Sequence, residues 1–127
     1  MAAALGLGLR SGDVALSLGT SGTVFAVSST PTADPSGAVA GFASASGEYL
    51  PLVCTLNATK VTDSISRLLG ADVNTGAELA LTAAHDPGST VLIPYFDGER
   101  TPNLPEATGT LLGLTNETTR AQIALAA

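Results

Sequence analysis

The hydrophobic pattern of the chain changes its period at Thr55, and this change constrains the fold more than any other feature. Before that residue, short β-prone runs are separated by turn-forming segments, whereas after it apolar residues recur at spacings of three and four. Short β-prone runs favour strands, and spacings of three and four favour amphipathic helices. The sequence therefore predicts strands followed by helices, in a mixed α/β fold.

Two β-hairpins are expected before the change of period. The first joins residues 13–18 to residues 23–27 through Gly19-Thr20-Ser21-Gly22, whose two glycines can take the positive φ of a tight turn. The second joins residues 38–42 to residues 48–53. Together the two hairpins account for the first half of a sheet-containing domain.

Two helices are expected directly after the hairpins. The first follows Thr55 and ends at Gly70, where a C-cap glycine belongs. The second covers about residues 74–84 and is stopped by Pro87-Gly88. The apolar face of the first helix is formed by Leu56, Val61, Ile65, Leu68 and Leu69. The apolar face of the second is formed by Ala77, Ala80, Leu81 and Ala84.

The remaining segments indicate one more strand and one more helix. Residues 90–94 form a continuous apolar run, as in a buried strand, and residues 95–108 contain the glycine and prolines of a long surface loop. Thr115 or Asn116 can cap a last helix. The residues up to Leu9 resemble the tail of a helix, so we expect a domain that is truncated at both ends.

Charge and cysteine content narrow the classes of function. The chain has 127 residues and a net charge of −6, with five scattered basic side chains, so neither a nucleic acid nor an acidic membrane surface is an expected partner. Cys54 is the single cysteine, which excludes an internal disulfide and favours a reducing compartment. No apolar stretch approaches membrane-spanning length. We therefore expect a cytoplasmic protein.

The Gly19-Thr20-Ser21-Gly22 turn is the strongest candidate for a binding site. A glycine turn can direct backbone N–H groups at one point, and the hydroxyls of Thr20 and Ser21 add donors suited to phosphate oxygens. A Walker A loop is excluded because no lysine follows and a strand does. From these four residues alone, a plain hairpin turn remains the alternative.

Two other groups of residues are candidates for chemistry. His85 is the single histidine and lies just past a helix end, where a favourable contact with the helix dipole explains it; no Ser-His-Asp arrangement or zinc site is indicated. Asp97-Gly-Glu-Arg100 offers two carboxylates and a guanidinium, which form either a general acid–base pair or a local ion pair.

Four segments together resemble the second domain of the FGGY family of carbohydrate kinases, and in particular its xylulokinase-like members. The segments, in order along the chain, are residues 12–25, residues 52–58, residues 94–102, and residues 109–114 with residues 122–127. They include Leu-Ser-Leu-Gly-Thr-Ser-Gly-Thr-Val-Phe, Leu-Val-Cys-Thr-Leu-Asn-Ala and Pro-Tyr-Phe-Asp-Gly-Glu-Arg-Thr-Pro. The resemblance covers essentially the whole chain.

The resemblance implies an actin-like, ribonuclease H-like ATPase fold, with residues 1–127 forming part of the C-terminal nucleotide-binding domain. Gly19, Thr20, Ser21 and Gly22 then correspond to a phosphate loop that faces the distal phosphates of ATP. The implied cofactors are ATP and Mg²⁺, and the implied reaction is phosphoryl transfer to a ketose, most closely D-xylulose to D-xylulose 5-phosphate.

The resemblance also implies what this chain does not carry. The family's catalytic Asp would lie upstream of Met1, Asp13 is not a substitute, and the N-terminal kinase domain is missing, so the isolated chain is expected to be inactive. Glu99 and Arg100 are expected to organise the domain rather than to do chemistry.

The alternatives to a kinase fragment are a non-catalytic actin-like module that binds a protein partner and a small unrelated α/β domain. Self-association through exposed apolar surface is also expected.

Overall fold

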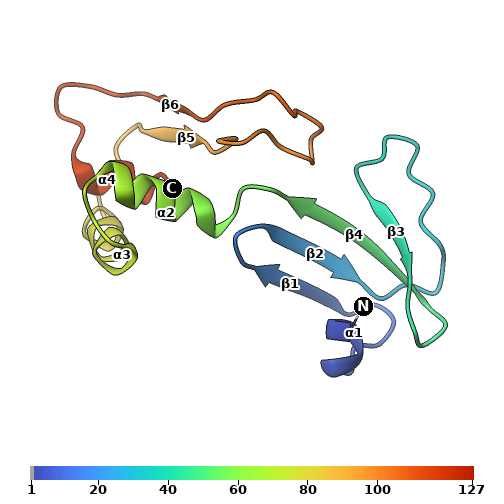
Figure 1. The fold of residues 1–127 in the computed structure, drawn as a ribbon. Helices are drawn as coiled ribbons and strands as arrows, with labels where there is room; N and C mark the ends of the chain where they lie inside the picture. The colour runs from blue at the N-terminus through green and yellow to red at the C-terminus, as the bar shows by residue number, and fades with distance from the viewer. Residues whose placement is uncertain (1) are drawn as a thin grey trace.

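The computed structural model describes residues 2–127, which form a four-stranded sheet at one end and a group of helices at the other (Figure 1). A short helix lies against the sheet, and a two-stranded ribbon lies beside the other three helices. The mixed α/β architecture predicted from the sequence is therefore confirmed. In chain order the elements are α1 (Ala2–Gly6), β1 (Val14–Leu18), β2 (Gly22–Ala26), β3 (Ala40–Ala43), β4 (Tyr49–Thr55), α2 (Thr59–Leu68), α3 (Val73–Thr82), β5 (Val91–Ile93), β6 (Thr110–Leu112) and α4 (Arg120–Leu125).

The sheet is antiparallel throughout and has the strand order β1-β2-β4-β3. Both expected hairpins are present, as β1–β2 and β3–β4. Their inner strands pair with each other, and Val24 of β2 lies opposite Val53 of β4. This pairing places the tip of the first hairpin beside the end of β4, where the chain leaves the sheet for α2.

One face of the sheet is covered and the other is open. Ala4 of α1 is buried with Phe25, Val27 and Leu50 in a small core on the covered face. Successive residues of a strand point to opposite faces, so the neighbours of these residues lie on the other side. That open face carries an exposed apolar row formed by Val14, Leu16, Leu18, Val24 and Val53.

Helix α2 begins at Thr59, four residues later than the change of hydrophobic period predicts. Thr55 is the last residue of β4 and pairs with Gly22, so the sheet extends further than the local pattern indicates. Val61 and Ile65 are buried as expected, but Leu68 is 74% exposed. Gly70 follows the helix with a φ of 67°, the conformation expected of a C-terminal glycine.

Helix α3 packs against α2 through a different face from the one predicted. Its N-cap is Asp72, whose side chain accepts a hydrogen bond from the Thr75 amide, so the helix begins at Val73. Gly76 is buried against Ser66 of α2. Only glycine fits at this position, because a side chain there would overlap the serine. The expected packing positions Ala77, Leu81 and Ala84 are exposed instead. Ala77 and Leu81 line an open apolar hollow of about 420 Å³ between α2, α3 and α4.

The C-terminal third differs from the sequence prediction at three points. Residues 110–112 form β6, which the sequence did not predict, and it is the one partner of β5. With a single partner strand, β5 is not buried, and Val91 is 55% exposed. The last helix begins at Arg120 rather than after Thr115 or Asn116, because Thr119 and Gln122 form a capping box. Among residues 2–127, no helix has the length and apolar character needed to cross a bilayer.

Candidate functional site

The tip of the β1–β2 hairpin is a three-residue bend. Leu18 and Gly22 form the last pair of the ladder, which leaves Gly19, Thr20 and Ser21 as the exposed bend. The bend is closed by a 3.0 Å hydrogen bond from the Gly19 amide to the Ser21 carbonyl. Neither glycine has a positive φ, contrary to expectation, because the bend spreads over three residues and Gly22 already belongs to β2.

Gly22 is required by close packing rather than by its conformation. A Cβ atom at this position would lie 2.8 Å from Cγ2 of Thr55 and 3.5 Å from Cβ of Ala58. Atoms at the first distance overlap, so any side chain would push β2 away from the end of β4. At Gly19, by contrast, a Cβ atom would meet only the Ser21 carbonyl oxygen, at 3.7 Å.

The carbonyl groups of the tip cap the N-terminus of α2. The Ala58 amide donates to the Thr20 carbonyl at 3.3 Å, and the Thr59 amide donates to the Gly19 carbonyl at 3.0 Å. Ala58 is the N-cap residue of α2 and has no side chain that could accept these bonds. The hairpin tip therefore satisfies the amides of the N-cap and of the first helical residue, which have no partner within the helix. Figure 1 shows the tip beside the beginning of α2.

The same two hydrogen bonds fix the direction of the next two amides. In a planar trans peptide the N–H points opposite to the C=O, and the carbonyls of Gly19 and Thr20 share peptide planes with the amides of Thr20 and Ser21. These two amides therefore point away from α2. Within residues 2–127 they donate to no protein acceptor, and the hydroxyls of Thr20 and Ser21 have no hydrogen-bond partner. The tip thus presents four free donors on an exposed bend.

Glu99 is buried at the junction between β4 and α2. Its side chain is 2% exposed, and its two oxygens accept hydrogen bonds from the junction and from its own loop. From the junction, the Leu56 amide donates at 2.8 Å, Nδ2 of Asn57 donates at 3.0 Å, and the Thr55 hydroxyl also donates. From the loop, the amides of Arg100 and Thr101 donate at 2.6 and 3.4 Å. This loop lies across the start of α2.

The hydrogen bonds determine the protonation state of Glu99. Desolvation raises the pKa of the carboxyl, but the bonds from Thr55, Leu56, Asn57 and Arg100 lower it by more, and the result is a pKa of about 2. The carboxylate is therefore ionised at neutral pH. It is stabilised by neutral donors, since no salt bridge to it is found in the described part of the chain.

The Asp97–Arg100 segment does not form the local ion pair expected from its sequence. Asp97 forms a salt bridge with Lys60 of α2 at 3.0 Å, and Arg100 contributes its backbone amide to Glu99. Asp97 therefore connects the loop to α2, and Glu99 connects it to the junction that precedes α2. This arrangement agrees with the organising role expected for Glu99.

Asn57 is a site residue that sequence reasoning missed. Its side chain is 8% exposed, and Nδ2 donates to the Gly98 carbonyl at 2.7 Å as well as to Glu99. Together with Thr55 it supplies polar groups on either side of Leu56. A signal was available, since two polar residues flank one apolar residue at the point where the hydrophobic period changes.

The described residues offer no side-chain cluster for a metal ion. Across residues 2–127, no group of three or more His, Cys, Asp or Glu side chains is arranged to hold one. His85 is exposed in the turn after α3, and Cys54 is a free, half-buried thiol on β4. Mg²⁺ stays a prediction from the resemblance, and these residues supply no ligand set for it. For ATP the fit is better, because the free donors of the tip suit phosphate oxygens.

Comparison with known proteins identifies the family. A sequence profile of the FGGY family of carbohydrate kinases, C-terminal domain, matches residues 14–127, and the chain belongs to this family. It is 54% identical over 127 residues to the xylulose kinase of Streptomyces coelicolor, covering 99% of this chain and 24% of that protein. The chain thus spans about a quarter of the length of the curated relatives it matches.

Solved structures agree with this assignment. The crystal structure of xylulose kinase from Bifidobacterium adolescentis superposes with a TM-score of 0.88 at 50% identity, covering 98% of this chain and 25% of that one. Plasmodium falciparum glycerol kinase with ADP has a TM-score of 0.77 at 16% identity, covering 98% of this chain and 26% of that one, and shows the fold alone. The fold is therefore the actin-like ATPase fold of FGGY kinases, and an unrelated α/β domain is excluded.

Proposed function

We propose that this chain is a phosphate-binding part of an ATP-dependent ketose kinase. The observation that carries the proposal is the hairpin tip, where the amides and hydroxyls of Thr20 and Ser21 are free and exposed, and α2 sets the direction of the two amides. Four donors on one bend suit the distal phosphate oxygens of ATP. In a protein of net charge −6, such neutral donors hold an anion without a basic patch.

The proposed reaction is transfer of the γ-phosphoryl group of ATP to a hydroxyl of a ketose, with D-xylulose as the first candidate. The xylulose kinases to which the chain is similar support this choice of sugar. The residues of this chain would bind and orient the phosphates, which supplies positioning and charge stabilisation. The general base and the main sugar contacts would come from a part of the longer kinase outside this chain.

The remaining parts of the proposal follow from this role. Residues 1–127 would form part of one C-terminal nucleotide-binding domain, which would be inactive without the N-terminal kinase domain. Mg²⁺ would accompany the phosphates of ATP rather than bind to carboxylates of this segment. A cytoplasmic location fits an ATP-dependent enzyme and the free thiol of Cys54.

The test is a titration of the ¹⁵N-labelled chain with Mg-ATP, followed by the amide signals of Gly19 to Thr23. We expect shifts at Thr20 and Ser21 that saturate at millimolar ATP. The double substitution Thr20→Val with Ser21→Ala removes both hydroxyls and should weaken apparent binding several-fold. Thr30→Val, on an exposed loop far from the tip, is the matched control. The absence of any shift at the tip at millimolar ATP would contradict the proposal and would leave the non-catalytic module.

A further inference from the structure

The buried carboxylate of Glu99 is connected to the hairpin tip through a short run of backbone. Its junction partners Thr55, Leu56 and Asn57 are followed directly by Ala58 and Thr59, whose amides hold the carbonyls of the tip. Glu99 itself does not touch the tip. Its influence on the tip must therefore pass through the position of the β4–α2 junction.

The junction lies between the last residue of β4, Thr55, which still pairs with Gly22, and the first residue of α2, Thr59. Apart from Glu99, its side-chain bonds are a local turn, in which the Asn57 amide donates to the Thr55 hydroxyl at 3.1 Å, and the bond from Nδ2 of Asn57 to the Gly98 carbonyl. The N-cap side chain of α2 makes no capping bond. Three of the hydrogen bonds that hold residues 55–57 in place end on one carboxylate. Loss of its charge would weaken them together, since hydrogen bonds to an ionised acceptor are about twice as strong as neutral ones.

We propose that Glu99 is a positioning residue for the phosphate-binding tip. By fixing Leu56 and Asn57, it places the Ala58 and Thr59 amides where they bind the carbonyls of Gly19 and Thr20. Those carbonyls in turn set the direction of the free amides of Thr20 and Ser21. The inference rests on the proposed function for its purpose, but the mechanical link holds whether or not ATP binds.

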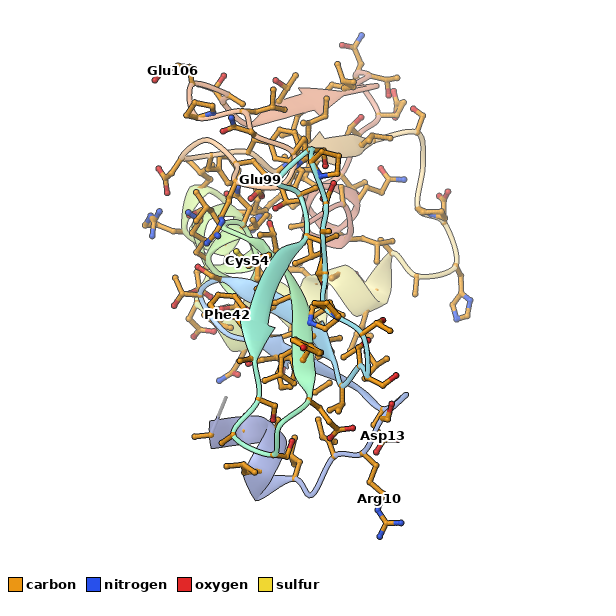
Figure 2. The ribbon with its side chains drawn as sticks, turned by 90° about the vertical axis from the view of Figure 1, so that its right-hand side faces the viewer. Arg10, Asp13, Phe42, Cys54, Glu99 and Glu106 are labelled. Carbon is orange, nitrogen blue, oxygen red and sulfur yellow. The ribbon has the colours of Figure 1, made fainter. Side chains whose placement is uncertain are left out.

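The test compares Glu99→Gln with Glu106→Gln in the 127-residue chain. Glu106 belongs to the same loop and is exposed, and Figure 2 shows it at the outer edge of the loop, whereas Glu99 lies among the chain segments. In Glu99→Gln, one acceptor oxygen becomes an N–H₂ donor among other donors. We expect amide hydrogen exchange at Ala58 and Thr59 to rise about tenfold, with shifted signals for Thr20 and Ser21. Glu106→Gln should leave all of them unchanged.

A general loss of stability is separated from positioning by a third variant. Ile65→Ala truncates a buried side chain of α2 one turn further along the helix, away from the junction and the tip. At matched loss of global stability, it should not change the signals of Thr20 and Ser21. If Glu99→Gln unfolds the chain, Thr55→Val removes the hydroxyl that donates to Glu99 and accepts from the Asn57 amide, and should produce a smaller effect of the same pattern. Unchanged exchange at Ala58 and Thr59 in folded Glu99→Gln would overturn the proposal.

Titration with Mg-ATP distinguishes this inference from the proposed function. If the unmodified chain binds ATP at Thr20 and Ser21 and Glu99→Gln raises the apparent Kd several-fold, both hold. If the unmodified chain shows no ATP shifts but Glu99→Gln still releases Ala58 and Thr59, the proposed function fails and the link stands. If the unmodified chain and Glu99→Gln show equal ATP shifts, and amide exchange at Ala58 and Thr59 is unchanged, the positioning role of Glu99 is rejected and the proposed function stands.

Discussion

The backbone amide of Leu56 donates a 2.8 Å hydrogen bond to the carboxylate of Glu99, across 43 residues of sequence. This bond joins the loop of residues 95–108 to the point where the chain leaves the sheet for α2. Because the carboxylate is buried and has neutral partners, its hydrogen bonds depend on its staying ionised. Stability should therefore respond to acid through this one group more than through an exposed carboxylate.

Acid should destabilise the chain between about pH 4.5 and pH 2 through Glu99. The pKa of this carboxyl falls from its ordinary 4.5 to about 2 in the folded chain. The stabilisation is therefore fully present above 4.5 and is lost as pH falls toward 2. At about 1.4 kcal/mol per pH unit, it amounts to roughly 3–4 kcal/mol. The measurement is the free energy of urea unfolding at several pH values.

Glu99→Gln is the control for this pH dependence. It should be less stable at pH 7 and should lose most of the decline between pH 4.5 and pH 2. A smaller decline should remain, because the pKa of Asp34 is lowered by the Val39 amide and that of Asp72 by the Thr75 amide. An identical acid decline in both chains would mean that Glu99 is not the group responsible.

The four strands of the larger sheet were predictable because their signals are local. Alternating side chains and glycine-rich turns define both hairpins within a few residues, and the tip donors follow from Thr20 and Ser21 themselves. The start of α2 was not predictable in this way. Thr55 continues in β4 because Gly22 lies beside it, and that contact joins residues far apart in sequence.

The contacts that hold the hairpin tip in place could be predicted less well than the tip itself. Capping of α2 by backbone carbonyls of the tip leaves no trace in residue type, since any residue has a carbonyl group. The partners of Glu99 also come from another part of the chain. The sequence indicated a structural role for this segment, but through a local ion pair with Arg100 that does not form.

Substitution of Gly22 should lower stability, whereas substitution of Gly19 should leave stability nearly unchanged and weaken ATP binding. Gly22→Ala places a methyl group against Thr55 and should destabilise the chain by about 1–3 kcal/mol. Gly19→Ala makes only an ordinary contact with the Ser21 carbonyl oxygen, at 3.7 Å and an ordinary backbone conformation, and should change stability by less than about 0.5 kcal/mol. It should instead weaken Mg-ATP binding, if phosphate approaches the bend closely. Urea unfolding and the amide titration separate the two effects. Equal destabilisation by both would contradict the packing role of Gly22.

The salt bridge between Lys60 and Asp97 should contribute little to stability. Its atoms lie 3.0 Å apart, but the side chain of Asp97 is 74% exposed, so solvent screens the attraction. Lys60→Ala should lower the free energy of unfolding by less than about 1 kcal/mol, and 0.5 M salt should remove most of that difference. A loss as large as that of Glu99→Gln would show that this pair, rather than the buried carboxylate, holds the loop on α2.

The open face of the sheet should cause the isolated chain to self-associate. Leu16 is 63% exposed on β1, and it lies in the row of apolar side chains that continues through Val24 to Val53. A contiguous apolar surface of this kind favours association of two copies. Leu16→Lys places a charge in the centre of the row and should shift the chain toward monomer in sedimentation velocity. Leu68→Lys, at a residue 74% exposed on α2, is the control and should not. A monomer at all concentrations without substitution would contradict this prediction.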